Sequence, residues 1–122
     1  MIDFNNKAFF KLSENADYAV IAADILLPDE TVLASFKSMR DGVIFTSRRV
    51  IAVNVQGLTG KKKDFTSMPY RAIQAFSIET VGTFDLDAEL DLFFSGVGKV
   101  RFEFSGRVDM RKIARCIAEH AL

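Results

Sequence analysis

The sequence predicts a mainly β domain of the α+β class, in which about seven antiparallel strands are closed by one C-terminal helix. The first observation is a pair of β-rich runs, residues 43–46 and 50–55, whose short separation is typical of a tight hairpin. The second is a strict alternation of acidic and apolar side chains over residues 85–92. The third is an apolar stripe at helical spacing over residues 110–121.

Size and charge restrict the function classes. A chain of 122 residues fits one domain with a core of its own. Lys and Arg number 16, as do Asp and Glu, so the formal net charge is zero. The summed field therefore offers no attraction for nucleic acid, and we expect no nucleic-acid partner. Zero net charge also removes the repulsion that would keep identical copies apart.

The first part of the chain, residues 1–28, is predicted to be an N-terminal helical extension of the domain at residues 29–122. Residues 1–14 are too apolar for a free tail and are expected to pack on something. Asn15 is a candidate N-cap for a helix that ends before Pro28. Tyr18, Ile21, Ala22 and Ile25 follow the spacing of an amphipathic helix. Whether this helix docks on its own subunit or on a neighbour stays open.

The remaining elements follow in order. Residues 31–39 predict a strand, and Asp41-Gly42 predicts the turn into the central hairpin. Residues 61–66 predict a short basic strand at a sheet edge, and residues 73–81 another strand with Phe76 and Ile78 toward the core. Asp109 is a candidate N-cap for the last helix. The apolar stripe of this helix includes Ile113 and Ile117.

The register of the hairpin at residues 85–104 can be predicted from the parity of its buried positions. A one-residue slip would move every apolar side chain to the wrong face. Even positions must therefore oppose even positions, which places Arg101 opposite Asp91 or Phe93. Acidic and basic side chains can then pair across the strands.

Two stretches, RDGVIFTSRRVIAVNVQGLTGKK and SMPYRAIQAFSIETVGTFDLDAEL, look like motifs of the bacterial pleckstrin-homology-like (PH-like) family. The resemblance covers residues 24–104 and implies a bent, seven-stranded antiparallel sandwich or barrel that is capped by the C-terminal helix. It also implies no catalytic residues, no cofactor, a poorly defined ligand and a tendency to assemble into rings.

Basic residues suggest an anion site. The candidates for binding anions or lipid headgroups are Arg48, Arg49, Lys61, Lys62 and Lys63. A run of lysines also marks a solvated edge strand, so both interpretations remain open. The connection at residues 38–42 is too short for the long basic loop with which eukaryotic PH domains hold inositol phosphates.

The acidic strand invites a calcium hypothesis, but alternate carboxylates on a straight strand lie about 7 Å apart and fan outward. We therefore expect no metal site. We expect the carboxylates to pair with basic side chains of the next strand or of a neighbouring subunit. His120 lies far from any nucleophile motif, which argues against a catalytic triad.

The candidate oligomer interface comprises Phe4, Phe9, Phe10, Phe93, Asp87, Glu89, Asp91, Lys99 and Arg101.

These patterns favour a non-enzymatic module that self-associates and presents a repeated surface to a protein or an anionic ligand. The alternative is a peripheral adaptor that binds anionic membrane headgroups through its Lys and Arg cluster. One unpaired cysteine, Cys116, and an N-terminus without signal-peptide features predict a cytoplasmic location.

Overall fold

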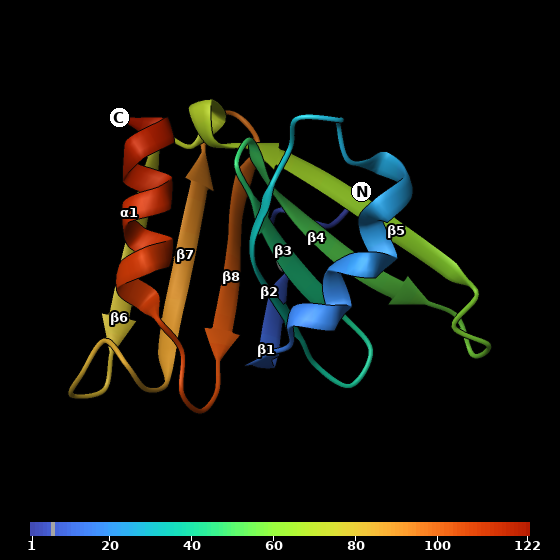
Figure 1. Ribbon diagram of the computed structural model, residues 1–122, viewed down its shortest axis with the longest axis horizontal. Coiled ribbons are helices and arrows are strands. Elements are labelled where there is room, and N and C mark those ends of the chain that lie inside the picture. The colour runs from blue at the N-terminus through green and yellow to red at the C-terminus, as the bar shows by residue number, and fades with distance from the viewer. Residues whose placement is uncertain (6) are drawn as a thin grey trace.

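The computed structural model describes residues 1–5 and 7–122, which form a strongly curled sheet with helices against its faces (Figure 1). Within these residues the sheet has eight strands in the order β5-β4-β3-β2-β1-β8-β7-β6. Neighbouring strands are antiparallel, except for β1 and β8, which run parallel. The predicted fold class, a mainly β domain with a bent sheet closed by a C-terminal helix, is confirmed, and the sheet forms a half-barrel.

One half of the sheet is a meander of β2 (Val32–Lys37), β3 (Gly42–Thr46), β4 (Arg49–Gln56) and β5 (Lys62–Pro69). Phe45 pairs with Val50, so Ser47 and Arg48 form the tight turn that the sequence predicts. The basic strand β5 is the outermost strand of this half, as expected.

The other half comprises β6 (Ala75–Thr80), β7 (Ala88–Phe94) and β8 (Gly98–Phe104). Its strands alternate between inward apolar and outward polar side chains, as the sequence predicts. Asp91 lies opposite Arg101, which confirms the predicted register. Strand β6 forms the second edge of the sheet.

Strand β1 (Ala8–Glu14) joins the two halves and adds an eighth strand to the seven predicted. Its first residues pair with β8, and its last two, Ser13 and Glu14, pair with β2. The register shifts between Phe9 and Leu12, where Lys11 adopts a φ of 54°. This bulge lets both apolar side chains face the core, and each is 1% exposed. Part of the predicted helical extension is therefore a strand of the sheet.

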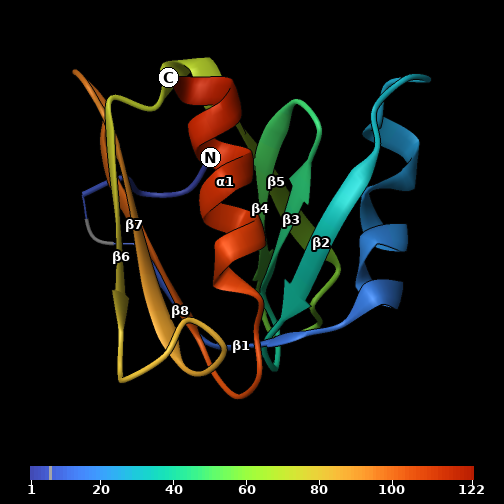
Figure 2. The same ribbon diagram turned by 60° about the vertical axis from the view of Figure 1, so that its left-hand side comes forward.

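The C-terminal helix α1 (Met110–Ala121) packs inside the curl and closes the main core. The Asp109 side chain accepts a hydrogen bond from the Lys112 amide, which confirms the predicted N-cap. Figure 2 shows α1 lying between the two halves of the sheet. Met110, Ile113 and Ile117 are buried among side chains from both halves.

A second, smaller cluster lies on the outer face of β3 and β4. It is covered by η1 (Ala16–Ile25), a short 3-10 helix in place of the predicted amphipathic α-helix. Asn15 accepts a hydrogen bond from the Tyr18 amide at 3.2 Å, so the predicted N-cap is confirmed. Ile44, Ile51 and Val53 are fully buried beneath η1. The middle of this half is therefore buried on both faces.

Candidate interaction surface

The outer face of β1, β8, β7 and β6 carries most of the residues that the sequence marks as a candidate interface. Successive side chains of a strand point to opposite faces, so odd-numbered residues of β7 and β8 point outward while Leu90, Leu92 and Phe102 fill the core. Glu89, Asp91, Phe93, Lys99 and Arg101 therefore share one surface, as predicted.

Arg101 is the electrostatic centre of this face. Its guanidinium donates two hydrogen bonds to the Asp91 carboxylate, at 2.9 Å from Nε and 3.0 Å from Nη2. A third contact joins Nη1 to the Glu89 carboxylate at 3.2 Å. The hydrogen bonds from Arg101 lower the pKa of Asp91. The predicted cross-strand pairing of acidic and basic residues is confirmed for this trio.

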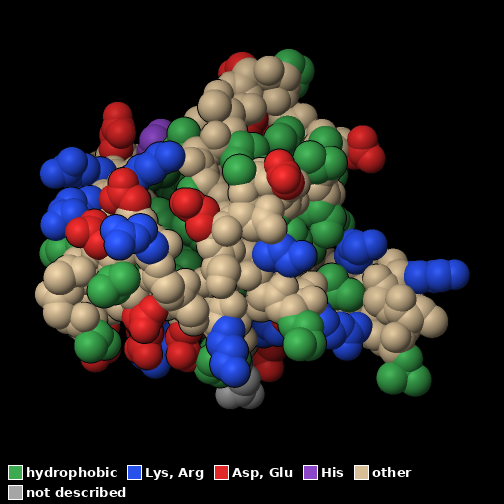
Figure 3. All heavy atoms as spheres, turned by 60° about the horizontal axis from the view of Figure 1, so that its bottom comes forward, with side chains coloured by type: hydrophobic (Ala, Val, Ile, Leu, Met, Phe, Trp, Pro, Cys, Tyr) green, Lys and Arg blue, Asp and Glu red, His purple; other side chains and the backbone are tan. Residues whose placement is uncertain are grey.

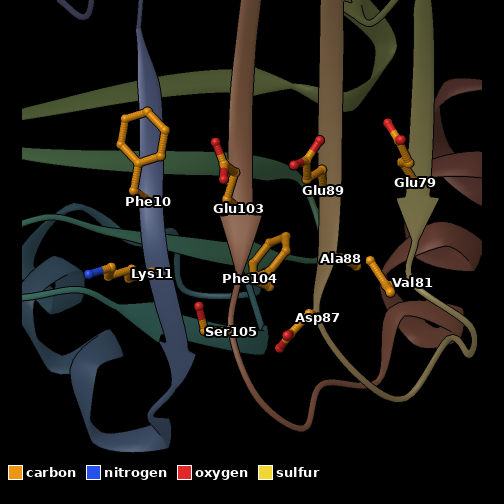
Figure 4. A pocket seen from close by; sticks show the side chains of 10 residues that line it. All are labelled: Phe10, Lys11, Glu79, Val81, Asp87, Ala88, Glu89, Glu103, Phe104 and Ser105. Atoms are coloured by element: carbon orange, nitrogen blue, oxygen red, sulfur yellow. The ribbon is translucent and has the colours of Figure 1, made fainter.

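A row of three glutamates crosses the same face. Glu79 on β6 lies opposite Glu89 on β7, and Glu89 lies opposite Glu103 on β8. Figure 4 shows the three carboxylates side by side, with the ring of Phe10 on β1 continuing the row. Like charges directly opposite each other destabilise a sheet. We expect this arrangement to lower the stability of the isolated subunit, in part offset by the contact between Arg101 and Glu89.

The row borders a shallow hollow of about 390 Å³ that also includes Val81, Asp87 and Ser105. The Asp87 carboxylate accepts a hydrogen bond from the Gly106 amide at 2.6 Å, so it fixes the β8–α1 loop. Among the described residues no group of three His, Cys, Asp or Glu side chains is arranged to hold a metal ion. The hollow is lined by acidic and apolar side chains, with Lys11 as the one cation among the lining residues that the structure describes.

The aromatic candidates divide into two pairs. Phe10 is 58% exposed and Phe93 44% exposed, which confirms their predicted exposure in a single subunit. The same prediction is wrong for Phe9, which stacks on Phe102 with ring centroids 5.2 Å apart. Phe4 is partly buried and meets Phe94 edge to face. Phe9 points inward because β1 belongs to the sheet, and Phe4 packs against the core from the segment before β1.

The predicted basic cluster is separated into two sites by the length of the β4–β5 hairpin. Arg49 pairs with Pro69 at one end of the hairpin, and Gln56 pairs with Lys62 at the other. At a rise of about 3.3 Å per residue, these ends are roughly 23 Å apart. The idea that Arg48 and Arg49 gather with the three lysines is therefore wrong.

The lysine end of the hairpin projects from the body of the molecule, and cationic side chains gather on it (Figure 3). Lys61, Lys62 and Lys63 are exposed there, and Leu58 at the tip is fully exposed. Arg40 donates a hydrogen bond to the Gly57 carbonyl, which ties the β2–β3 turn to this tip. Met39, in the same turn, is 97% exposed. We call this set of residues the projecting rim.

Arg49 has a structural role. Its guanidinium donates to both carboxylate oxygens of Glu30 at 2.9 Å, and Thr46 donates to the same carboxylate at 2.5 Å. The Glu30 side chain is completely buried, and the Arg49 hydrogen bonds lower its pKa to about 2. Arg49 also donates to the Ile25 carbonyl, so this network anchors η1 and the chain that follows it to β4. The sequence contains no signal for this pairing.

No helix in the described part of the chain is long and apolar enough to cross a bilayer.

Comparisons with known proteins agree with this architecture. The family model described as Bacterial PH domain matches residues 3–121. A crystal structure of a protein with a pleckstrin-homology domain from Shewanella loihica PV-4 has a TM-score of 0.76 and 36% identity, covering 92% of this chain and 98% of that one. A pleckstrin homology domain from Shewanella amazonensis SB2B has a TM-score of 0.62 and 41% identity, covering 87% and 86%.

Two Bacillus subtilis (strain 168) proteins are similar in sequence. The uncharacterized protein YjqA is 54% identical over 74 residues, which span 61% of this chain and 59% of YjqA. The uncharacterized protein YozO is 27% identical over 111 residues, which span 91% of this chain and 95% of YozO. PH-domain families are typically non-catalytic. The match over residues 3–121 and the curled sheet closed by α1 establish that this chain belongs to the bacterial PH domain family.

Proposed function

We propose that this PH-like domain is a non-enzymatic assembly module that binds further copies of itself through the outer face of β1, β8, β7 and β6. The observation that carries the proposal is the glutamate row Glu79, Glu89 and Glu103 beside the exposed ring of Phe10. The assembled copies would present a repeated surface to a protein or an anionic ligand.

Electrostatics and exposure support self-association. Of the glutamates in the row, Glu89 has Arg101 as its ion-pair partner, whereas no ion pair within the described residues involves Glu79 or Glu103. A basic surface from another molecule would relieve the repulsion in the row. Because the chain has zero net charge, every acidic surface has a matching excess of basic groups elsewhere on the same molecule.

Apolar contact area adds to this attraction. Phe10 and Phe93 expose large rings on the face, and exposed aromatic side chains are enriched at interface centres. The strands β5 and β6 are the two ends of the sheet, and each offers unpaired backbone groups to a neighbour. A face-to-edge contact between copies is heterologous, and such contacts generate closed rings when the rotation closes.

The solution mass tests this proposal. We expect light scattering after size exclusion to give a discrete multimer, and Phe10→Ser to lower the mass at equal protein concentration. Asp24→Asn, which removes an exposed carboxylate on η1, is the matched surface control and is expected to leave the mass unchanged. A monomer at tens of micromolar for the wild-type chain would overturn the proposal.

A second candidate function, a peripheral adaptor for anionic membranes, is favoured by the projecting rim. Leu58 and Met39 expose apolar side chains between Arg40 and the three lysines. An apolar side chain that enters the headgroup layer beside cations combines the two attractions that hold peripheral proteins on anionic bilayers. Arg48 and Arg49 lie at the other end of the hairpin and do not contribute to this surface.

Co-sedimentation with vesicles of phosphatidylcholine and phosphatidylserine tests the adaptor function. Changing Lys61, Lys62 and Lys63 together to Glu is expected to abolish binding, and Leu58→Ser to weaken it. Arg115→Glu on α1 is the control for a charge reversal outside the rim, and it is expected to leave binding unchanged. Equal binding by the triple variant and the wild type would exclude the rim as a membrane contact.

A further inference from the structure

A second hollow lies at the opposite end of the β4–β5 hairpin from the lysines. Figure 1 shows that this end of the hairpin is the one near the C-terminus of α1. Three elements meet there: the β3–β4 turn, the last turn of α1 and the 3-10 helix η2 (Tyr70–Ala72). The hollow has a volume of about 420 Å³, and its lining residues are Asp29, Ser47, Arg48, Tyr70, Arg71 and His120.

The walls of this hollow are held in place by hydrogen bonds and ring packing. The Tyr70 hydroxyl donates to the Thr46 carbonyl at 2.7 Å, which joins η2 to the end of β3. The Arg48 and Arg49 amides both donate to the Thr46 hydroxyl, which fixes the turn that carries Arg48. The His120 ring lies 5.2 Å from the Tyr70 ring. Such preorganisation reduces the entropy lost on binding a ligand.

Cationic and hydrogen-bonding groups converge on the hollow from separate elements. Arg71 takes part in no ion pair among the described residues. Arg48 pairs with Asp29, but half or more of each side chain is exposed, so this pair exchanges readily with other anions. The Nδ1 atom of His120 contacts the Cys116 carbonyl at 2.8 Å, and a carbonyl can only accept. Nδ1 therefore carries a proton, which leaves Nε2 for a ligand.

An adjoining apolar hollow indicates what kind of anion would fit. Its lining includes Ile25, Leu27 and Pro69, and it shares Arg48 and Arg71 with the first hollow. Ile25 is 41% exposed and Leu27 48% exposed. The two arginines thus stand between a polar hollow and an apolar one. Arg49, by contrast, is fully engaged by Glu30 and Ser67.

We propose that Arg48, Arg71 and His120 form a binding site for a phosphate monoester whose organic group lies against Ile25, Leu27 and Pro69. Guanidinium groups match the oxygens of phosphate with paired hydrogen bonds, and two of them balance a dianion once it has displaced Asp29 from Arg48. This proposal rests on the part of the proposed function in which the domain binds an anionic ligand, and it specifies that ligand as a phosphate monoester. It does not depend on self-association.

NMR titration of the full chain tests this site, with inorganic phosphate and phenyl phosphate as the probes. We expect saturable shifts of the Arg48 and Arg71 Nε–H and His120 ring signals. Phenyl phosphate is expected to bind more tightly, because its ring reaches the apolar hollow. Arg71→Gln and Arg48→Gln are each expected to weaken binding by about tenfold. Lys62→Gln, at the far end of the hairpin, is the matched control and is expected to bind as the wild type does.

These variants distinguish a localised site from diffuse attraction by surface charge. Equal weakening by Lys62→Gln, or no effect of Arg71→Gln, would overturn the site, because the anion would then be attracted by diffuse charge. Vesicles with and without phosphatidic acid identify the source of the phosphate. Co-sedimentation that requires both phosphatidic acid and Arg71 assigns a lipid headgroup, whereas binding of phenyl phosphate alone assigns a soluble ester. The solution mass decides self-association independently.

Discussion

The two halves of the sheet differ in how many of their faces are buried. The middle of β3 and β4 is buried on both faces, by the main core on one side and by η1 on the other. Strands β7 and β8 are buried on the core face only and present charged side chains on the other. The first half therefore contributes mainly to the stability of the fold, whereas the outer face of the second half is exposed and available for contacts with other molecules.

The largest expected effect comes from the doubly buried half. Ile51 is fully buried beneath η1, so Ile51→Ala is expected to lower the free energy of unfolding by about 2–5 kcal/mol. Phe93→Ala, on the exposed face, is expected to cost clearly less. Urea denaturation followed by circular dichroism measures both. Similar losses for the two variants would contradict the division between the halves.

A loss of about 3 kcal/mol is expected from Glu30→Gln, because it leaves the Arg49 guanidinium without its buried counter-ion. The hydrogen bonds from Arg49 lower the pKa of Glu30 from 4.5 to about 2. A lowered pKa in the folded state stabilises the protein above the unfolded value. This stabilisation is lost as the pH falls from about 4.5 to about 2.

Melting curves over this pH range check the sign. The stability of the wild type should fall between about pH 4.5 and about pH 2, and the Glu30→Gln variant should lose less stability over the same range. Asp29→Asn, which breaks the exposed pair with Arg48, is the neighbouring control and is expected to cost less than about 1 kcal/mol.

An intermediate effect is expected from Gly42→Ala. A β-carbon at this position would lie 2.2 Å from Cε2 of Tyr18, whose ring covers the start of β3. Burial, with the nearby Asp41 charge, raises the pKa of Tyr18 to about 12, which reflects how closely the ring is enclosed. Overpacking of this kind costs about 1–3 kcal/mol. In a Tyr18→Ala background the cost of Gly42→Ala should nearly vanish; an undiminished cost would locate the strain elsewhere.

The smallest effect, and the one of opposite sign, belongs to the exposed face. Glu103→Gln removes one of three aligned charges and is expected to stabilise the subunit by roughly 0.2–0.5 kcal/mol at low salt. Added salt should shrink this gain because the row is solvent-exposed. Glu14→Gln, an exposed change outside the row, serves as the comparison. A destabilised Glu103→Gln variant would show that the row supports the fold.

Much of the fold follows from pattern alone. The parity argument limits the partner of Arg101 to Asp91 or Phe93, and the structure has the Asp91 pair. Of the two registers that parity allows, the one with Asp91 places Glu89 opposite Glu103, so the glutamate row was predictable in part. Its third member, Glu79, required the pairing of β6, a strand whose outward residues gave no distinctive signal.

Other features depend on geometry that the pattern does not contain. The bulge at Lys11 puts Phe9 and Leu12 three positions apart, which hides the alternation of β1. In η1, Tyr18 and Ile21 are also three apart, a spacing that suits both an α-helix and a 3-10 helix. The distance between the arginine and lysine groups depends on the length of β4, which single-residue propensities do not fix.

Strand β1 also has a consequence for synthesis and folding. It precedes the other strands of this domain, yet its pairing with β8 joins Leu12 to Phe104, in the last strand. During synthesis, the edge of β1 that pairs with β8 stays unpaired until almost every other element has left the ribosome. Contacts of such sequence separation slow folding, so the last strand to be translated controls when the two half-sheets become one.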